Sequence, residues 1–233
     1  MAAYMTSECE LFLQELDQQI QSKHLLKHDF YQAWSKGELT VDCLQEYAKE
    51  YYHHVKAFPT YISAIHARCD DQSIRSILLK NIIEEEAGSP NHPELWKNFA
   101  LSLGVNEEEL VSHKPNNDIE KLIHTFRQIC SQNCLANGVA ALYTYESQIP
   151  EICVSKIAGL KEHYGMNDSA AWHYFTVHIQ ADIEHAAEER ALLQRLVSSQ
   201  EVQEIKRSVN AILDVLWNFL SGLCQRYHIE CAT

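Results

Sequence analysis

Apolar residues recur along almost the whole chain at intervals of three and four positions, the spacing of a helix with one buried face. The pattern is clear near the end of the chain, where Val202, Ile205, Val209, Ile212, Leu216 and Leu220 follow one another at this spacing. We find no alternating apolar and polar stretch long enough to predict a β-strand. The pattern therefore predicts an all-α fold built as a helical bundle.

Glycines, prolines and capping residues divide this pattern into about nine or ten helices. The expected helices cover residues 8–23, 28–36, 40–68, 71–87, 93–103, a short acidic piece after Asn106, 117–131, 133–149, 151–164, 168–197 and 200–223. Pro59 should kink or restart the third of these. Since the chain has no linker, repeat or low-complexity tract, we expect a single domain over residues 1–233. The last ten or so residues have a weak pattern and are expected to be a mobile tail.

Composition limits the function classes. The chain carries 32 acidic and 19 basic residues, a net charge of -13, which argues against a nucleic-acid partner. No apolar run is long enough to cross a membrane, and no basic amphipathic stretch indicates a membrane surface. The first residues lack a standard signal peptide, and eight scattered cysteines form no zinc signature. These features predict a cytoplasmic protein with reduced thiols.

Three ligand-type residues interrupt one apolar helix face. His178, Asp182 and His185 occupy positions i, i+4 and i+7, which lie on one side of a helix. The same face carries Phe175, Glu189, Leu192 and Leu196 and should point to the core, where unpaired polar groups cost several kcal/mol. The triplet is either a buried hydrogen-bonded network or part of a metal site.

Other polar residues fall on predicted core positions elsewhere. Glu146 continues a stripe of Leu135, Val139 and Leu142, and glutamate is rarely buried without a partner. Glu85 and Glu86 continue the stripe through Leu78 and Ile82, whereas Glu84 should point away.

His92 follows Glu85 at the expected N-cap of the next helix. Gly88 and Pro90 separate them, so only a tight turn would bring the two side chains together. Histidines and carboxylates from several helices form the ligand set of a two-metal site in a bundle, and they suit iron or manganese better than zinc.

Several segments closely resemble a known family. These are HDFYQAWSKGEL, EYAKEYYHHVKAFPTYISAIHARCDD, PNHPELW and NGVAALYTYESQIP, together with Glu85-x6-His92 and His178-x3-Asp182-x2-His185. The chain resembles the haem-oxygenase-like dimetal oxidases, related in fold to pyrroloquinoline-quinone synthase C. Within them it is most similar to the CADD-like group, named for association with death domains. The likeness covers nearly the whole chain.

The resemblance implies a haem-oxygenase-like fold and an unusual activity. CADD-like proteins make para-aminobenzoate, the folate precursor, from their own residues with dioxygen. Tyr31 corresponds to the consumed tyrosine and Lys156 to the lysine that donates the amino nitrogen. Two metal ions, iron with iron or iron with manganese, are implied, and the metal ligands carry over as Glu85, His92, Glu146, His178, Asp182 and His185.

The resemblance also leaves alternatives. The group's name implies binding to host death-domain proteins and promotion of apoptosis, which would require export to the host cell. The wider family also allows a multi-turnover oxidase acting on a diffusible substrate. A homodimer is expected for this fold group. From the residues alone, Lys156 is better explained as a solvated lysine, and other tyrosines, such as Tyr47, Tyr51 and Tyr145, also compete for the role of Tyr31.

Overall fold

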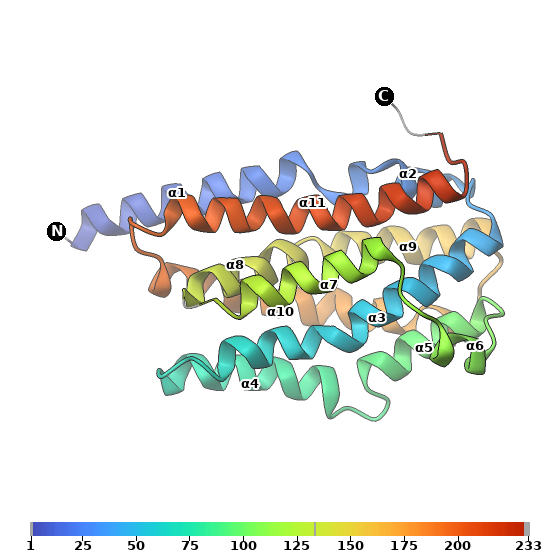
Figure 1. Cartoon of the computed structure of the whole chain (residues 1–233), viewed down its shortest axis with the longest axis horizontal. Helices are drawn as coiled ribbons and strands as arrows, with labels where there is room; N and C mark the ends of the chain where they lie inside the picture. Colours follow the sequence, from blue (N-terminus) through green and yellow to red (C-terminus); the bar gives the residue numbers. More distant parts are fainter. Residues whose placement is uncertain (1, 133, 231–233) are drawn as a thin grey trace.

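A computed structural model describes residues 2–132 and 134–230 as a bundle of helices that run mostly along the long axis of the molecule (Figure 1). Two short 3-10 turns, η1 (Leu25–Lys27) and η2 (Ser169–Ala171), connect longer elements. The α-helices of the described residues are α1 (Ala2–Ser22), α2 (Asp29–Lys36), α3 (Val41–His66), α4 (Gln72–Glu86), α5 (His92–Ser102), α6 (Glu107–Ser112), α7 (Asn117–Cys130), α8 (Leu135–Glu146), α9 (Ile149–His163), α10 (His173–Leu196) and α11 (Val202–Arg226).

The all-α prediction is confirmed, since the described residues contain helices and turns but no strand. Three local predictions were wrong. Helix α3 does not restart at Pro59 but continues through it, with Phe58, Pro59 and Tyr61 all buried in the core, whereas a kink there stays a prediction. Asp168 caps η2 rather than the long helix, which begins at His173. Asn91, not His92, caps α5, because its side chain accepts from the Glu94 amide in a reciprocal capping box.

Helix α8 forms the centre of the bundle. Every residue from 136 to 146 is buried, which explains why its sequence is apolar on all sides. It packs against α10, α11, α7 and α3 (Figure 1). The carboxylate of Glu146, at the end of α8, is therefore held in the interior by helices on several sides.

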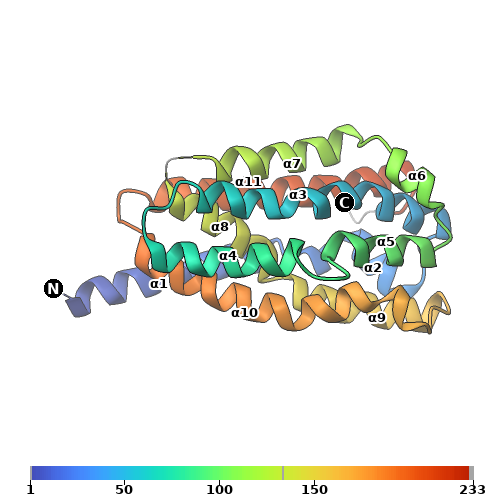
Figure 2. The ribbon, with the colours of Figure 1, turned by 90° about the horizontal axis from the view of Figure 1, so that it is seen from below.

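Helices α4 and α5 follow one another beside α10 (Figure 2). The turn between them brings the end of α4 and the start of α5 next to the middle of α10. Helix α9 continues beyond α8 and packs against α10 and α2. This arrangement places residues from α4, α5, α8 and α10 around one interior region.

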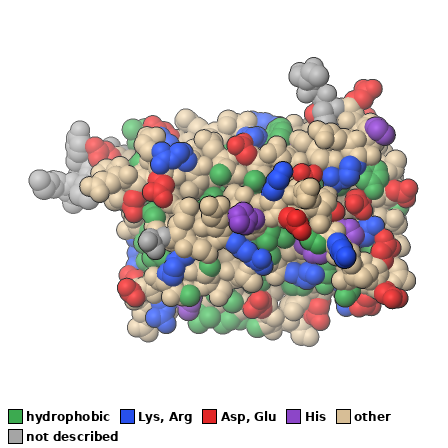
Figure 3. Space-filling view, in the orientation of Figure 1, with side chains coloured by type: hydrophobic (Ala, Val, Ile, Leu, Met, Phe, Trp, Pro, Cys, Tyr) green, Lys and Arg blue, Asp and Glu red, His purple; other side chains and the backbone are tan. Residues whose placement is uncertain are grey.

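Acidic and basic side chains are interspersed on the face shown in Figure 3. Within the described residues, no helix is long and apolar enough to cross a membrane. Near the end of the chain, residues 224–226 belong to α11 and the Ile229 amide donates to the Cys224 carbonyl at 2.9 Å. Residues 231–233 lie outside the described part, so the mobile tail stays a prediction.

Candidate metal centre and the buried tyrosines beside it

The first group of potential ligands is Glu85 on α4, His92 on α5 and His178 on α10. One ligand atom from each lies within 4.8 Å of the others, and all three side chains are buried. Glu85 Oε2 is 2.8 Å from His92 Nδ1, so the turn after α4 does bring these residues together. His178 donates from Nδ1 to the Tyr174 carbonyl at 2.7 Å, which leaves its Nε2 available to a ligand.

The second group is Glu146 on α8 with Asp182 and His185 on α10. Their ligand atoms also lie within 4.8 Å of one another and all are buried. His185 Nδ1 is 3.1 Å from Glu146 Oε1 and 3.6 Å from Asp182 Oδ1. Asn81 Nδ2 donates to the same Glu146 oxygen at 3.2 Å. The spacing along α10 places the two groups one helical turn apart, because His178 and Asp182 are neighbours on the same face.

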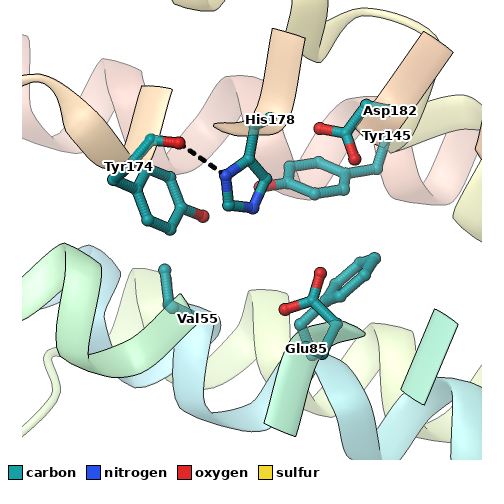
Figure 4. A pocket seen from close by; sticks show the side chains of 7 residues that line it. Val55, Glu85, Tyr145, Tyr174, His178 and Asp182 are labelled. Atoms are coloured by element: carbon teal, nitrogen blue, oxygen red, sulfur yellow. Dashed lines mark hydrogen bonds between the residues drawn. The ribbon is translucent and has the colours of Figure 1, made fainter. Parts of the chain in front are cut away.

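A cavity of about 10 Å³ lies between the ligands, lined in part by Glu85, His178 and Asp182. Figure 4 shows these side chains facing one space, with Tyr145 and Tyr174 at its edge. This volume is about enough to hold one water molecule. This space admits a very small molecule, whereas a separate aromatic substrate does not fit in it.

The donor set fits two metal ions. Glu146 Oε2, Asp182 Oδ2 and both oxygens of Glu189 are buried without a hydrogen-bond partner. His92 Nδ1 is also unpartnered despite its closeness to Glu85 Oε2, because the two atoms are not aligned for a hydrogen bond. Among the described residues, no lysine or arginine forms an ion pair with Glu85, Glu146 or Asp182. The basic side chains paired with these carboxylates in the described part of the chain are His92 and His185, whose protons a bound metal ion would replace.

The pKa shifts follow from the same burial. Burial, with the charges of Glu146 and Glu85, raises the pKa of Asp182 to about 8. Burial also lowers the pKa of His178 well below its usual value, so this ring is neutral and offers a lone pair. A bound cation would relieve the repulsion between the clustered carboxylates, because its positive charge offsets their negative charges.

A second buried cluster lies on the side of α9. Lys156 is 4% exposed, and its Nζ donates to the Tyr47 hydroxyl at 2.6 Å. The Tyr47 hydroxyl is 3.3 Å from the Tyr31 hydroxyl. Lys156 Nζ lies 5.2 Å from the centre of the Tyr31 ring and 5.0 Å from that of Phe175. Tyr31, Tyr47 and Lys156 therefore form one hydrogen-bonded chain inside an aromatic shell.

Burial lowers the pKa of Lys156 to about 7. Because no carboxylate among the residues that the structure describes pairs with this amine, desolvation dominates, and a large fraction of the amine is neutral near pH 7. A neutral amine is nucleophilic, whereas an ammonium group is not. Burial raises the pKa of Tyr31, so its phenol keeps its proton.

Aromatic contacts connect the two clusters. Tyr51 stacks on Tyr47 with ring centres 5.4 Å apart, and its hydroxyl is 2.6 Å from that of Tyr145. Tyr145 lines the cavity between the metal-type ligands. Tyr174 stacks on His178 and packs edge-on against Trp96, which in turn contacts Tyr51. Tyr31 is thus separated from the cavity by a continuous layer of aromatic rings.

Comparison with known proteins places this arrangement in a family. Residues 13–226 match the TENA/THI-4/PQQC family. The chain belongs to the TENA/THI-4/PQQC family.

Individual relatives agree with this membership. The chain is 53% identical over 218 residues to a 4-aminobenzoate synthase of Chlamydia pneumoniae, covering 94% of this chain and 95% of that protein. A domain with a heme oxygenase-like fold from Shewanella denitrificans superposes with a TM-score of 0.78 at 18% identity, covering 92% and 91% of the two chains. A CADD-like protein of unknown function from Nostoc punctiforme gives 0.74 at 17% identity, covering 96% and 100%. These structures confirm the haem-oxygenase-like fold.

In this member of the TENA/THI-4/PQQC family, the structure brings all six predicted metal ligands into the two groups. It also brings Tyr31 and Lys156 together. The reading of Lys156 as a solvated side chain was wrong, because α9 starts anew at Ile149 and turns this lysine toward α3.

Sequence reasoning gave no role to two polar residues beside the centre, Asn81 and Glu189, and misplaced a third, Glu84. Asn81 precedes Glu85 by one helical turn, so the same stripe would have identified it. Glu189 follows His185 by one turn on the α10 stripe and is buried beside Glu146. Glu84 was expected to point away, yet its Oε2 lies 2.8 Å from His185 Nε2. Its side chain is 38% exposed, so no burial signal marked it.

Proposed function

We propose that this chain is an oxygen-dependent dimetal oxidase that makes 4-aminobenzoate from its own Tyr31, with Lys156 as the donor of the amino nitrogen. The observation that carries the proposal is the buried Lys156 amine beside the Tyr31 ring. Contacts of Tyr47 with Tyr51 and of Tyr51 with Tyr145 connect this pair to the cavity of the six-ligand centre. The similarity to the 4-aminobenzoate synthase of Chlamydia pneumoniae supports the same activity.

The centre would hold two ions, an iron pair or iron with manganese. Glu85, His92 and His178 would hold one, and Glu146, Asp182 and His185 the other. When bound and reduced, such a pair supplies the activation of dioxygen that an aromatic side chain needs for oxidation. The small cavity beside the ligands limits access to molecules of about the size of dioxygen or water.

The chain's own residues would supply the aromatic ring and the amine and hold them in position. 4-Aminobenzoate contains a para-substituted benzene ring with a carboxylate. A tyrosine side chain supplies it once the phenol oxygen is replaced by an amine, the Cα–Cβ bond is cut and the Cβ carbon is oxidised to the carboxylate, with dioxygen as the oxidant. Tyr31 is already held in place, so no separate substrate has to be bound or oriented. Tyr47 holds Lys156 Nζ near this ring and bonds to the Tyr31 hydroxyl. Because Tyr31 and Lys156 are consumed, each chain would turn over once.

The test is a single-turnover reaction of purified protein. Metal-free chain is loaded with Fe(II), or with Fe(II) and Mn(II), and exposed to oxygen and a reductant, and 4-aminobenzoate is measured by mass spectrometry. Protein grown with ¹⁵N-lysine should give ¹⁵N-labelled product, and peptide mapping should show a mass loss at Tyr31. Tyr31→Phe should abolish product, whereas Tyr52→Phe, at a half-buried position on α3, should leave the yield unchanged. Unlabelled product or an intact Tyr31 would contradict the proposal.

Two alternative functions make different demands on the molecule. A multi-turnover oxidase needs room for a diffusible substrate, and the cavity of about 10 Å³ beside the ligands favours the internal tyrosine instead. Binding to host death-domain proteins, export to a host cell and a homodimer stay predictions. Pull-down with a receptor death domain and light scattering of the purified chain test the first and the last of these.

A further inference from the structure

Glu84 is the outer neighbour of one predicted metal ligand. Its Oε2 lies 2.8 Å from His185 Nε2, and the opposite ring nitrogen, Nδ1, lies 3.1 Å from Glu146 Oε1. The imidazole of His185 therefore bridges a half-exposed carboxylate on α4 and the buried ligand group. Lys80 Nζ, one turn earlier on α4, is 3.9 Å from the other Glu84 oxygen.

A ligating imidazole needs a fixed proton position. A neutral imidazole carries its proton on one nitrogen and offers a lone pair on the other. A hydrogen-bond acceptor beside one nitrogen holds the proton there, so the other nitrogen is left to bind the metal. His178 is fixed in this way by the Tyr174 carbonyl, to which its Nδ1 donates. His185 has no such carbonyl partner among its contacts, and Glu84 is the acceptor at its Nε2.

We propose that Glu84 is a positioning residue that holds the His185 proton on Nε2 and so directs Nδ1 toward the ion shared with Glu146 and Asp182. This inference rests on the metal centre of the proposed function but not on the identity of the product. Carboxylates that accept from a ligating histidine typically change metal affinity about 10–100-fold when removed.

The experiment uses Co(II) as the probe and measures binding without any turnover. Metal-free wild type, Glu84→Ala and Glu84→Gln are titrated with Co(II) in competition with a chelator, and stoichiometry and affinity are read from the visible absorption. Glu84→Ala should bind the second ion about 10–100-fold more weakly than wild type. Glu84→Gln should recover most of the affinity, because its amide oxygen still accepts from Nε2. Glu84 is 38% exposed, so neither change opens a hole in the core.

The matched control is Glu188→Ala. Glu188 contacts the same Lys80 at 3.4 Å and is similarly exposed, but it forms no ion pair or hydrogen bond with His185 within the described residues. This change removes the same charge from the same surface network and should leave Co(II) affinity unchanged. It separates a specific effect on His185 from a general loss of negative charge.

A spectroscopic signature completes the test. In the Zn(II)-loaded wild type, the His185 Nε2 proton should give a downfield NMR signal that exchanges slowly with water. Glu84→Ala should lose this signal and Glu84→Gln should keep it. If Glu84→Ala bound two Co(II) ions as tightly as wild type and kept the signal, the inference would be overturned while the proposed function stood. If wild type bound no Co(II), the metal centre itself would fail.

Discussion

Replacing Lys156 by methionine tests whether its amine is buried as the structure describes. Methionine has a similar length and no charge, so it fills the same space between Tyr31, Tyr47 and Phe175. It removes a buried amine whose proton binding differs strongly between the folded and unfolded chain. The expected consequence is a change in how stability depends on pH.

The magnitude follows from the pKa. Burial lowers the pKa of Lys156 from 10.5 to about 7, whereas the unfolded chain keeps the higher value. Between these values the unfolded chain binds a proton that the folded chain lacks, so the free energy of unfolding increases with pH. The destabilisation caused by burying the Lys156 amine has its full value below pH 7 and falls to zero near pH 10.5. From pH 7 to pH 9, wild type should gain about 2 kcal/mol relative to Lys156→Met.

Urea unfolding of the metal-free proteins at both pH values measures this increment. All other titrating groups are common to the two proteins, so they cancel in the difference between wild type and Lys156→Met. Lys161→Met, at an exposed position on the same helix, is the control and should follow wild type. If the free energies of unfolding of wild type and Lys156→Met changed in parallel with pH, Lys156 would be protonated and solvated, and the reasoning would fail.

Two further predictions concern the centre and the hydroxyl chain. Asp182→Asn removes a buried carboxylate whose pKa is raised to about 8, so the metal-free variant should melt at a higher temperature than wild type. It should also lose the thermal stabilisation by added Mn(II) that wild type shows, and stabilisation equal to wild type would contradict its role as a ligand. Tyr47→Phe removes the acceptor of Lys156 Nζ and should lower the 4-aminobenzoate yield about tenfold at unchanged metal content. An unchanged yield would show that Tyr47 does not position the amine.

The sequence was sufficient for the fold class and for the ligand triplet on α10. Helical spacing fixes which residues share a face, so His178, Asp182 and His185 had to lie together once that helix formed. The sequence was not sufficient to predict the surroundings of Lys156 or Glu84. The position of Lys156 depends on how α9 packs after Pro150, and the contact of Glu84 with His185 joins two helices 101 positions apart in sequence.

At Pro59 the local preference of the sequence and the observed helix differ. Local propensity predicts an interruption there, because proline has no amide hydrogen to donate. In the structure the buried neighbours on both sides hold α3 in one piece. Tertiary packing outweighs the local preference at this position.

The burial of Tyr31 has a consequence for the fate of the chain. Its ring is 4% exposed and packs edge-on against Phe30, so it is part of the core as well as the proposed source of product. Removing a buried aromatic ring from a core typically costs about 3–5 kcal/mol. A chain that has given up this ring would unfold more readily than an unused one. Cellular proteases would then degrade spent copies first, and the supply of product would be limited by the rate at which new copies are translated.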